Sequence, residues 1–227
     1  MPLIIIFSLL IWLQDFKSPF YVADRVGKYG KLFKMIKFRS MIVNASSSGV
    51  DSTAEDDNRI TNIGKIVRKF KIDEIPQLFN VFMGKMSFVG PRPNVRREVD
   101  IYTKEELELI SIKPGLTDFA SIVFSDEAEI LVGKDDLNLA YNQLVRPGKS
   151  KLGLFYVKNN NLTVDVFLIL ITLINVFSRR MSLKLVVKLL KLQKAGYHLV
   201  KIASRNEPLY PTPPPGSKLV VQNRNGI

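Results

Sequence analysis

Residues 71–84 read Lys71-Ile72-Asp73-Glu74-Ile75-Pro76-Gln77-Leu78-Phe79-Asn80-Val81-Phe82-Met83-Gly84 and predict a short helix that follows two adjacent carboxylates. Apolar residues recur at i, i+3, i+4 and i+7, so the helix is expected to bury one apolar face, made of Ile75, Leu78, Phe79 and Phe82. Gly84 is a natural end for it. Because proline is tolerated only in a first helical turn, Pro76 places Asp73 close to the N-cap and Glu74 in that turn.

Two interpretations of this acidic pair are open. In the first, Asp73 caps the helix and Glu74 interacts favourably with the helix dipole, as isolated Asp-Glu pairs usually do. In the second, one carboxylate is a covalent nucleophile beside a phosphate site, while its neighbour holds a metal ion or relays a proton. A helix N-terminus favours anions, so a phosphate is a suitable ligand for this position.

The residues that follow predict a rigid loop that presents one arginine. They read Lys85-Met86-Ser87-Phe88-Val89-Gly90-Pro91-Arg92-Pro93, and the Gly-Pro and Pro-X-Pro elements restrict the backbone around Arg92. A rigidly held guanidinium suits bidentate recognition of a phosphate group. We therefore expect a phosphate site close to the acidic pair.

The composition narrows the chemistry that the chain can perform. With 227 residues, of which 46% are hydrophobic, the chain can bury the core of a single domain. Its net charge of +12 suits nucleic acid, anionic lipid or phosphorylated substrates equally well. The absence of cysteine excludes disulfides and thiolate sites, and one histidine, His198, leaves little scope for histidine catalysis. Carboxylates, lysines and arginines remain as the reactive groups.

Further motifs accompany the central segment in a consistent order along the chain. They are Arg25-Val26-Gly27, Phe33, Lys37-Phe38-Arg39-Ser40-Met41, Asp57, Arg59-Ile60-Thr61, Gly64, Arg68, Lys113-Pro114-Gly115-Leu116-Thr117, Tyr156-Val157 and Asp165. Together with residues 73–93, this pattern closely resembles the signature of the bacterial sugar transferases, the small monotopic phosphoglycosyl transferases. The resemblance extends over about residues 1 to 176. After Thr117 the sequence departs from the Gly-Leu-Ala-Gln continuation of many relatives, so the sugar is not predicted.

The resemblance implies a fold, an activity and a location. The expected fold is α+β, mostly helical with a small β-hairpin, in a monotopic membrane-associated single domain. The expected reaction transfers a phosphosugar from a UDP-sugar to polyprenyl (undecaprenyl) phosphate, with Mg2+, a covalent aspartyl intermediate and release of UMP. It would start the assembly of a cell-surface polysaccharide or glycoconjugate at the cytoplasmic face of the bacterial inner membrane. Anionic membrane lipids are further expected partners, and a homodimer is compatible with the pattern.

The resemblance also implies roles for individual residues. Asp73 would be the nucleophile, and Glu74 would bind Mg2+ or assist proton transfer. Phosphate groups of the substrate would be bound by Lys37, Arg39, Arg68 and Arg92. The shape of the site would depend on Gln77, Asn80, Gly90, Pro91 and Pro93.

The N-terminal residues 1–13 are almost wholly apolar but fall short of the ~20 residues that cross a bilayer as a helix. We expect them to enter a membrane without spanning it, and a buried core helix is the alternative. A signal peptide is disfavoured because no basic region precedes the apolar run. By resemblance, Met1-Pro2 matches the break in the family's re-entrant hydrophobic helix, so the expected membrane segment, residues 1–16, is a truncated form of that helix.

Residues 20–41 predict a β-hairpin with its turn at residues 27–30. The alternation of a strand puts Lys37 and Arg39 on one face, where they could line a diphosphate site or simply be solvated. Residues 44–58 are rich in Ser, Asp and Asn and predict a surface loop that can close over a site.

The remaining sequence predicts mainly helices, which lie at residues 60–70, 95–111 and 164–177. The catalytic domain would cover residues 17–178. Residues 179–207 predict a basic amphipathic region that lies on an anionic membrane or packs against the body. The Pro-rich residues 208–227 predict an extended, mobile tail.

Two other classes of function stay open at this stage. The chain could be a catalytically impaired, membrane-associated remnant of the family that acts as a binding or scaffold protein. It could also be a basic nucleic-acid-binding module, although no recognised nucleic-acid motif accompanies the charge.

Overall fold

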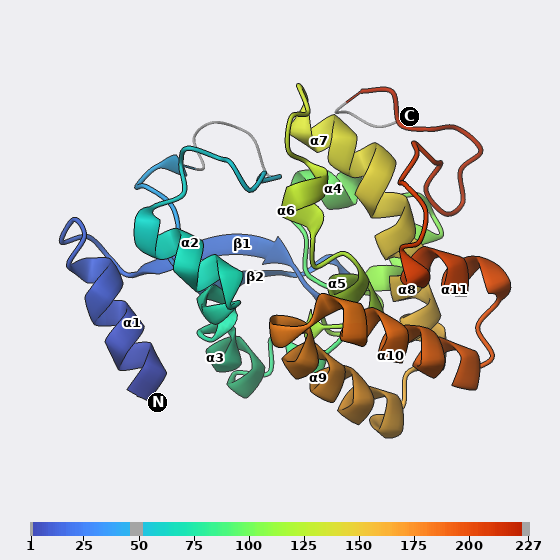
Figure 1. The fold of residues 1–227 in the computed structure, drawn as a ribbon, viewed down its shortest axis with the longest axis horizontal. Helices are drawn as coiled ribbons and strands as arrows, with labels where there is room; N and C mark the ends of the chain where they lie inside the picture. The colour runs from blue at the N-terminus through green and yellow to red at the C-terminus, as the bar shows by residue number, and fades with distance from the viewer. Residues whose placement is uncertain (1, 46–51, 224–227) are drawn as a thin grey trace.

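Figure 1 shows the protein as a computed structural model, which describes residues 2–45 and 52–223. Residues 46–51 of the predicted surface loop, residues 224–227 of the predicted tail and Met1 of the predicted helix break lie outside the described residues. The described chain is mostly helical in a single domain, as predicted, and it has a second small sheet besides the predicted hairpin. Its strands are β1 (Phe20–Val26), β2 (Leu32–Phe38), β3 (Ser87–Val89) and β4 (Gly115–Thr117). Its α-helices are α1 (Pro2–Trp12), α2 (Asn62–Lys69), α3 (Gln77–Phe82), α4 (Arg96–Asp100), α5 (Phe119–Val123), α6 (Glu127–Ile130), α7 (Leu137–Ala140), α8 (Arg146–Asn159), α9 (Leu162–Phe177), α10 (Arg179–Leu192) and α11 (Tyr197–Ser204).

The predicted hairpin is confirmed. Strands β1 and β2 pair in antiparallel register from Phe20 opposite Phe38 to Val26 opposite Leu32. Tyr29 and Gly30 in the connecting turn have positive φ angles of 57° and 76°, which complete the reversal of the chain. Phe38 is buried against α1 and α2, so the hairpin supports the N-terminal part of the fold.

The helix predicted after the acidic pair begins later and faces the other way. Asp73 and Glu74 lie in a 3₁₀ turn, Ile72–Glu74, and α3 begins only at Gln77, with Pro76 as its N-cap. The expected apolar face is exposed: Leu78, Phe79 and Phe82 are 42%, 41% and 91% exposed, whereas Gln77 and Asn80 are buried. The prediction of a buried apolar face was therefore wrong. The inner side of α3 lies against β2, where backbone groups require hydrogen-bond partners that apolar side chains cannot supply.

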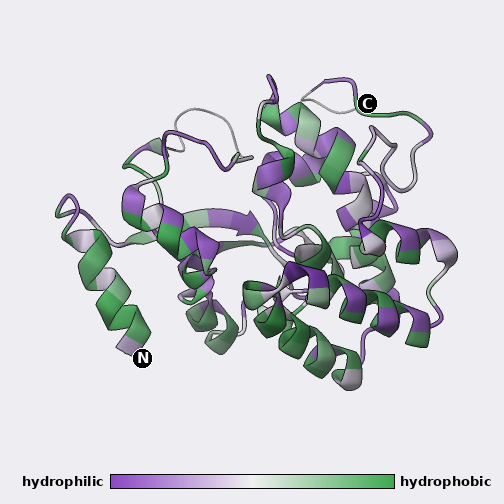
Figure 2. Ribbon diagram, in the orientation of Figure 1, coloured by the Kyte–Doolittle hydropathy of each residue, from purple (hydrophilic) through white to green (hydrophobic). Residues whose placement is uncertain are grey.

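Apolar side chains are also exposed on two other helices. In Figure 2, α1, α3 and α9 lie along the lower side of the molecule and carry many hydrophobic residues. Exposed large side chains include Ile5 on α1 and Phe177 at the end of α9. Within residues 2–45 and 52–223, no helix is both long and apolar enough to reach across a bilayer, and α1 has 11 residues. The expected re-entrant geometry thus remains a prediction.

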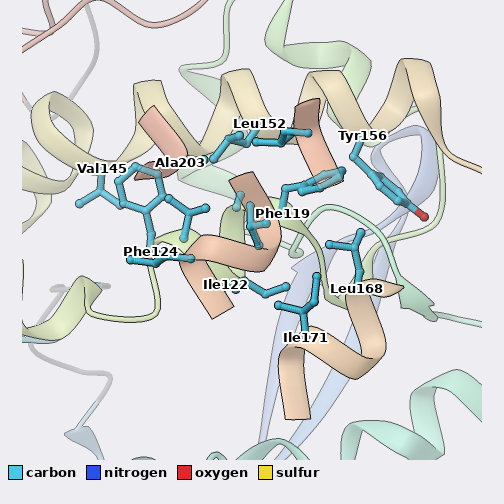
Figure 3. Packing of buried hydrophobic residues seen from close by; sticks show 14 of the residues in the cluster. Phe119, Ile122, Phe124, Val145, Leu152, Tyr156, Leu168, Ile171 and Ala203 are labelled. Carbon is cyan, nitrogen blue, oxygen red and sulfur yellow. The ribbon is translucent and has the colours of Figure 1, made fainter. Parts of the chain in front are cut away.

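The main apolar core lies among α5, α8, α9, α10 and α11, on the right of Figure 1. Figure 3 shows how side chains from these helices and the neighbouring turns interlock; it labels Phe119, Ile122, Phe124, Val145, Leu152, Tyr156, Leu168, Ile171 and Ala203. Leu152 and Leu168 have no exposed surface. Because α5 follows β4 after one residue, this core also anchors β4.

Parallel strands β3 and β4 approach each other unusually closely. They pair at Ser87 with Gly115 and at Val89 with Thr117. A Cβ atom on Gly115 would lie 2.2 Å from the Gly90 nitrogen and 2.5 Å from the Val89 carbonyl carbon. Both obstacles are backbone atoms, so only glycine fits here. The pair leads directly into the loop that carries Arg92.

Two other regions differ from expectation. The helix predicted over residues 95–111 is interrupted after α4, where reciprocal hydrogen bonds between Thr103 and Glu106 form a turn that leads into a separate 3₁₀ helix, Glu106–Ile110. Residues 208–223 form no helix or strand and make contacts with the body that were not predicted. The Pro215 carbonyl accepts from Thr103 Oγ1, the Val221 carbonyl accepts from Gln143 Nε2, and Val221 is buried.

Helix α10 packs against the body, which was one of the two predicted arrangements. Leu183, Val186, Leu189 and Leu190 are buried in the main core. Its lysines at positions 184, 188 and 191 are exposed on the opposite side. The amphipathic pattern is thus explained by contact with α9 and α5.

Gly115→Ala should lower the free energy of unfolding by about 2 kcal/mol or more, because backbone atoms cannot rotate away from the added methyl group. Denaturant unfolding of the detergent-solubilised protein measures this change. Gly196→Ala is the control, since no atom lies within 4 Å of the position that its Cβ would take and its φ of −61° is ordinary. Equal stability of the two variants would contradict the close contact between β3 and β4.

Candidate active site

Three segments bring four charged side chains together. Lys37 comes from the end of β2, Asp73 and Glu74 come from the 3₁₀ turn before α3, and Arg92 comes from the loop after β3. The Lys37 Nζ atom lies 3.6 Å from Glu74 Oε1 and 4.0 Å from Asp73 Oδ2. These side chains are only 12% to 23% exposed. These two acidic and two basic side chains thus form one cluster, the central group, with little access to water.

Glu74 is held by a forked interaction with Arg92. Arg92 Nη1 donates to Glu74 Oε2 and Nη2 donates to Oε1, both at 2.8 Å. Nη1 also donates to the Leu116 carbonyl of β4 at 2.8 Å, which fixes the guanidinium to the sheet. Burial by itself would raise the pKa of Glu74, but the charges of Arg92 and Lys37 outweigh it and lower that pKa to about 2. Glu74 is therefore ionised at neutral pH.

The pKa of Asp73 is shifted in the opposite direction from that of Glu74. Its burial raises its pKa, and the charge of Lys37 opposes this effect. Its Oδ1 atom is buried and has no hydrogen-bond partner in the part of the chain that the structure describes. Burial also disfavours the charged form of Lys37 and lowers its pKa. Of the two carboxylates, Asp73 is the one with an oxygen that has no hydrogen-bond partner among the described residues.

Helix α3, which follows the acidic pair, has two buried polar residues, Gln77 and Asn80. Asn80 Nδ2 donates to the Lys34 carbonyl at 2.7 Å, and Asn80 Oδ1 accepts from the Ile36 amide at 3.0 Å. Gln77 has no exposed surface, and neither polar atom of its side chain has a partner among the described residues. The site-shaping positions predicted on this helix are therefore both internal.

The backbone of the loop around Arg92 depends on Gly90, Pro91 and Pro93, which the sequence analysis predicted to shape the site. A Cβ on Gly90 would lie 2.6 Å from the Lys113 carbonyl oxygen. The Gly90 amide donates to the Thr117 carbonyl, and the Pro91 carbonyl accepts from Gly115. Pro93 follows Arg92, and both residues line one large cavity. The loop therefore follows β4 closely and holds Arg92 at a defined place.

Two predicted phosphate ligands lie apart from the central group. Arg39 donates from both terminal nitrogens to the carboxylate of Asp15, with Nη2 to Oδ1 at 2.6 Å, and this hydrogen bonding lowers the pKa of Asp15 to about 2. Arg39 lies beyond the end of β2, so strand alternation does not set its direction. Arg68 is half-buried on α2 and is close enough for its charge to oppose the rise in the Asp73 pKa.

A cavity of about 1050 Å³ opens over these residues. Its walls include the central group and further cations, among them Arg25, Arg59 and Lys71. Sequence reasoning did not assign these three residues to the site, although Arg25 and Arg59 lie in recognised motifs and Lys71 directly precedes the acidic turn. The cavity exceeds the needs of a simple diphosphate and could hold a larger anionic ligand.

The donor set fits a magnesium ion that takes most of its ligands from elsewhere. Among the described residues, no three acidic or histidine side chains converge to hold a metal ion. Mg2+ usually needs only one or two carboxylates, with water and substrate phosphates as the other ligands. Asp73 Oδ1 has no partner in the described structure, and each Glu74 oxygen keeps a lone pair after bonding to Arg92.

Comparison with known proteins identifies the family of this chain. The model of the family described as bacterial sugar transferase matches residues 1–179, which is most of the chain. The chain belongs to the bacterial sugar transferase family. The resemblance expected from the central motifs is confirmed. Residues 180–227, with most of α10, all of α11 and the packed C-terminal segment, lie beyond the matched region of this sugar transferase.

Among curated relatives of this sugar transferase, two are named for undecaprenyl phosphate and a third for a lipid carrier. The UDP-N-acetylgalactosamine-undecaprenyl-phosphate N-acetylgalactosaminephosphotransferase of Aeromonas hydrophila is 33% identical over 175 residues, 76% of this chain and 38% of that protein. The undecaprenyl-phosphate galactose phosphotransferase of Salmonella typhimurium is 39% identical over 137 residues, 52% of this chain and 29% of that protein. The UDP-galactose-lipid carrier transferase of Erwinia amylovora is 39% identical over 119 residues, which cover 46% of this chain and 25% of that protein. The matched part thus spans less than two fifths of each of these three relatives.

Arg92→Lys should lower the free energy of unfolding at pH 7 by about 1.5 to 3 kcal/mol, because an ammonium cannot reproduce the fork to a shielded carboxylate. The folded pKa of Glu74, about 2, lies below its ordinary value of 4.5, so its ionisation stabilises the fold above pH 4.5. The difference between parent and variant should therefore shrink as pH falls from 4.5 towards 2.

Denaturant unfolding at several pH values measures this effect. Arg96→Lys is the matched control, because its ion pair with Asp100 is exposed and should change stability by less than about 0.5 kcal/mol. A loss for Arg92→Lys that stays constant from pH 7 to pH 2 would contradict the assignment of the fork to ionised Glu74.

Proposed function

We propose that this sugar transferase transfers a phosphosugar from a UDP-sugar to undecaprenyl phosphate through a covalent intermediate on Asp73. The observation that carries the proposal is the contrast between the two carboxylates: Arg92 engages both oxygens of Glu74, whereas Asp73 Oδ1 has no partner among the described residues. The names of the three relatives support the substrate class. The cavity beside Asp73 is large enough for a nucleotide sugar.

The reaction would proceed in two displacements at one phosphorus atom. A carboxylate oxygen of Asp73 attacks the sugar-proximal phosphorus of the UDP-sugar, forming an acyl phosphate bond. The bond from this phosphorus to the bridging oxygen breaks, and UMP leaves with the electron pair. A phosphate oxygen of undecaprenyl phosphate then attacks the same phosphorus and releases Asp73, giving a lipid-linked diphosphosugar.

The cations of the central group would stabilise charge that develops on the phosphoryl oxygens. Lys37 lies beside both carboxylates, and Arg92 is fixed by Glu74 and the Leu116 carbonyl. Fixed cations are effective because they need no reorganisation during the reaction. Glu74 thereby acts by holding Arg92. Mg2+, if held by Asp73 and Glu74, would neutralise the charge of the diphosphate.

The apolar side of the molecule suits contact with the lipid that carries the acceptor. Helices α1, α3 and α9 expose large apolar side chains along the lower side of the molecule in Figures 1 and 2. Helix α3 follows the acidic turn after two residues, so this surface lies close to Asp73. We infer that the surface inserts into the cytoplasmic face of the bacterial inner membrane, where undecaprenyl phosphate can reach the site.

Asp73→Asn should abolish UMP release, because a neutral carboxamide cannot act as the nucleophile in this reaction. The substitution conserves shape, so circular dichroism and thermal unfolding should still report a folded protein. The measurement uses detergent-solubilised protein with Mg2+, undecaprenyl phosphate and a panel of UDP-sugars. Asp100→Asn is the control, since Asp100 is exposed on α4 and pairs only with Arg96 in the described structure.

Turnover by Asp73→Asn at the rate of the parent would exclude Asp73 as the nucleophile. If the parent chain releases no UMP from any UDP-sugar while remaining folded and membrane-bound, the alternative of a catalytically impaired scaffold is favoured instead.

Phe82→Asp should weaken binding to lipid vesicles by about tenfold or more, because an exposed aromatic side chain contributes roughly 1.5 to 3 kcal/mol when an apolar phase covers it. Phe82 is 91% exposed. Leu219→Asp is the control, because Leu219 is 64% exposed but lies in the C-terminal segment, away from α1, α3 and α9. Sedimentation with vesicles measures binding, and equal binding of the two variants would contradict the proposed orientation.

A further inference from the structure

We propose that Asn80 is a positioning residue, which holds strand β2 so that Lys37 is fixed against Asp73 and Glu74. Its effect on turnover rests on the proposed function, whereas its effect on β2 does not. Asn80 touches none of the reacting groups and would act through the backbone that carries Lys37.

The side chain of Asn80 completes an open sheet edge. Strand β2 pairs with β1 on one side only, which leaves its other edge without a strand in the described structure. On this edge the Asn80 carboxamide accepts from the Ile36 amide at 3.0 Å and donates to the Lys34 carbonyl at 2.7 Å. It thus imitates the peptide group of a third strand. Asn80 has no exposed surface, so water cannot replace these bonds.

The backbone of Asn80 is tied to a third segment. Its carbonyl accepts from the amides of Lys85 and Met86, at 2.9 and 3.1 Å. These residues lead into β3 and from there to the loop that carries Arg92. One residue therefore connects β2, which carries Lys37, with α3 and the start of β3, the elements next to the acidic turn and the Arg92 loop.

The position of Lys37 depends on a fixed backbone, because the contacts of its side chain with the two carboxylates are long. Its Nζ atom is 3.6 Å from Glu74 and 4.0 Å from Asp73, which is longer than a hydrogen bond. A lysine side chain has four rotatable bonds, so these contacts cannot set its position without a fixed backbone. Lys37 directly follows Ile36, the residue whose amide Asn80 binds.

A carboxamide is the only side chain that suits this position without a buried charge. Aspartate could accept from Ile36 but could not donate to Lys34, and it would bury a negative charge. A leucine would leave one donor and one acceptor of β2 unpaired. The outward face of α3 is apolar and offers no substitute.

The kinetic test is a double-mutant cycle with Lys37. Asn80→Ser should lower the rate of UMP release by about tenfold in the parent but by less than about twofold in Lys37→Met, where no ammonium remains to be positioned. The same fold loss in both backgrounds would overturn the proposal. Asn142→Ser is the matched control: Asn142 is a buried asparagine whose side chain also makes two hydrogen bonds, to Asn138 and Arg146, and its effect should not depend on Lys37.

Hydrogen exchange gives a second test that needs no turnover. Asn80→Ser should speed exchange of the Ile36 amide by at least about tenfold, because that amide loses its acceptor. Asn142→Ser should leave it unchanged. Unaltered exchange at Ile36 in Asn80→Ser would overturn the proposal even if the enzyme is active. Faster exchange in a chain that releases no UMP would retain the structural role of Asn80 and reject the proposed function.

Discussion

The forked contact between Arg92 and Glu74 is the interaction on which the rest of the site depends. Removing two carboxylates and two cations from water is costly unless each charge is paired at a defined distance. Arg92 meets this condition because its guanidinium binds both oxygens of Glu74 and a carbonyl of β4. Asp73 is buried beside this anion without a tight partner, so burial and the charge of Glu74 raise its pKa, while the charge of Lys37 opposes the rise. The fold thus makes two neighbouring carboxylates unequal.

The surrounding structure can be understood as the support for that arrangement. The contact between Gly90 and Gly115 lets β3 approach β4, which places the Arg92 loop over Leu116. The main core anchors β4 through α5. On the opposite side, α3 directs its polar residues inward and its apolar residues outward. A single six-residue helix therefore serves both the charged group and the surface proposed to contact lipid.

The sequence predicted the parts of this structure that depend on local rules. The turn at residues 27–30 predicted the hairpin, and the motif pattern predicted that Lys37, Asp73, Glu74 and Arg92 share a site. The direction of α3 was not predictable, because periodicity identifies an apolar face but not whether protein or another apolar phase covers it. The contact of Arg39 with Asp15 was not predictable, because Asp15 lies in a loop with no periodic signal; Arg39 lines the same cavity as Asp73, and its binding of phosphate stays a prediction. The C-terminal contacts were missed because a Pro-rich composition does not reveal which carbonyls, such as those of Pro215 and Val221, are hydrogen-bonded.

The central claim is that Asp73, and not Glu74, carries the phosphosugar. Intact-protein mass spectrometry after incubation with a UDP-sugar and Mg2+, without lipid acceptor, tests it most directly when followed by peptide mapping. We expect an added mass equal to one phosphosugar on the peptide that contains Asp73, with fragmentation placing it on that residue and loss of the mass when undecaprenyl phosphate is added. An adduct on Glu74, or complete turnover without any adduct, would contradict this account.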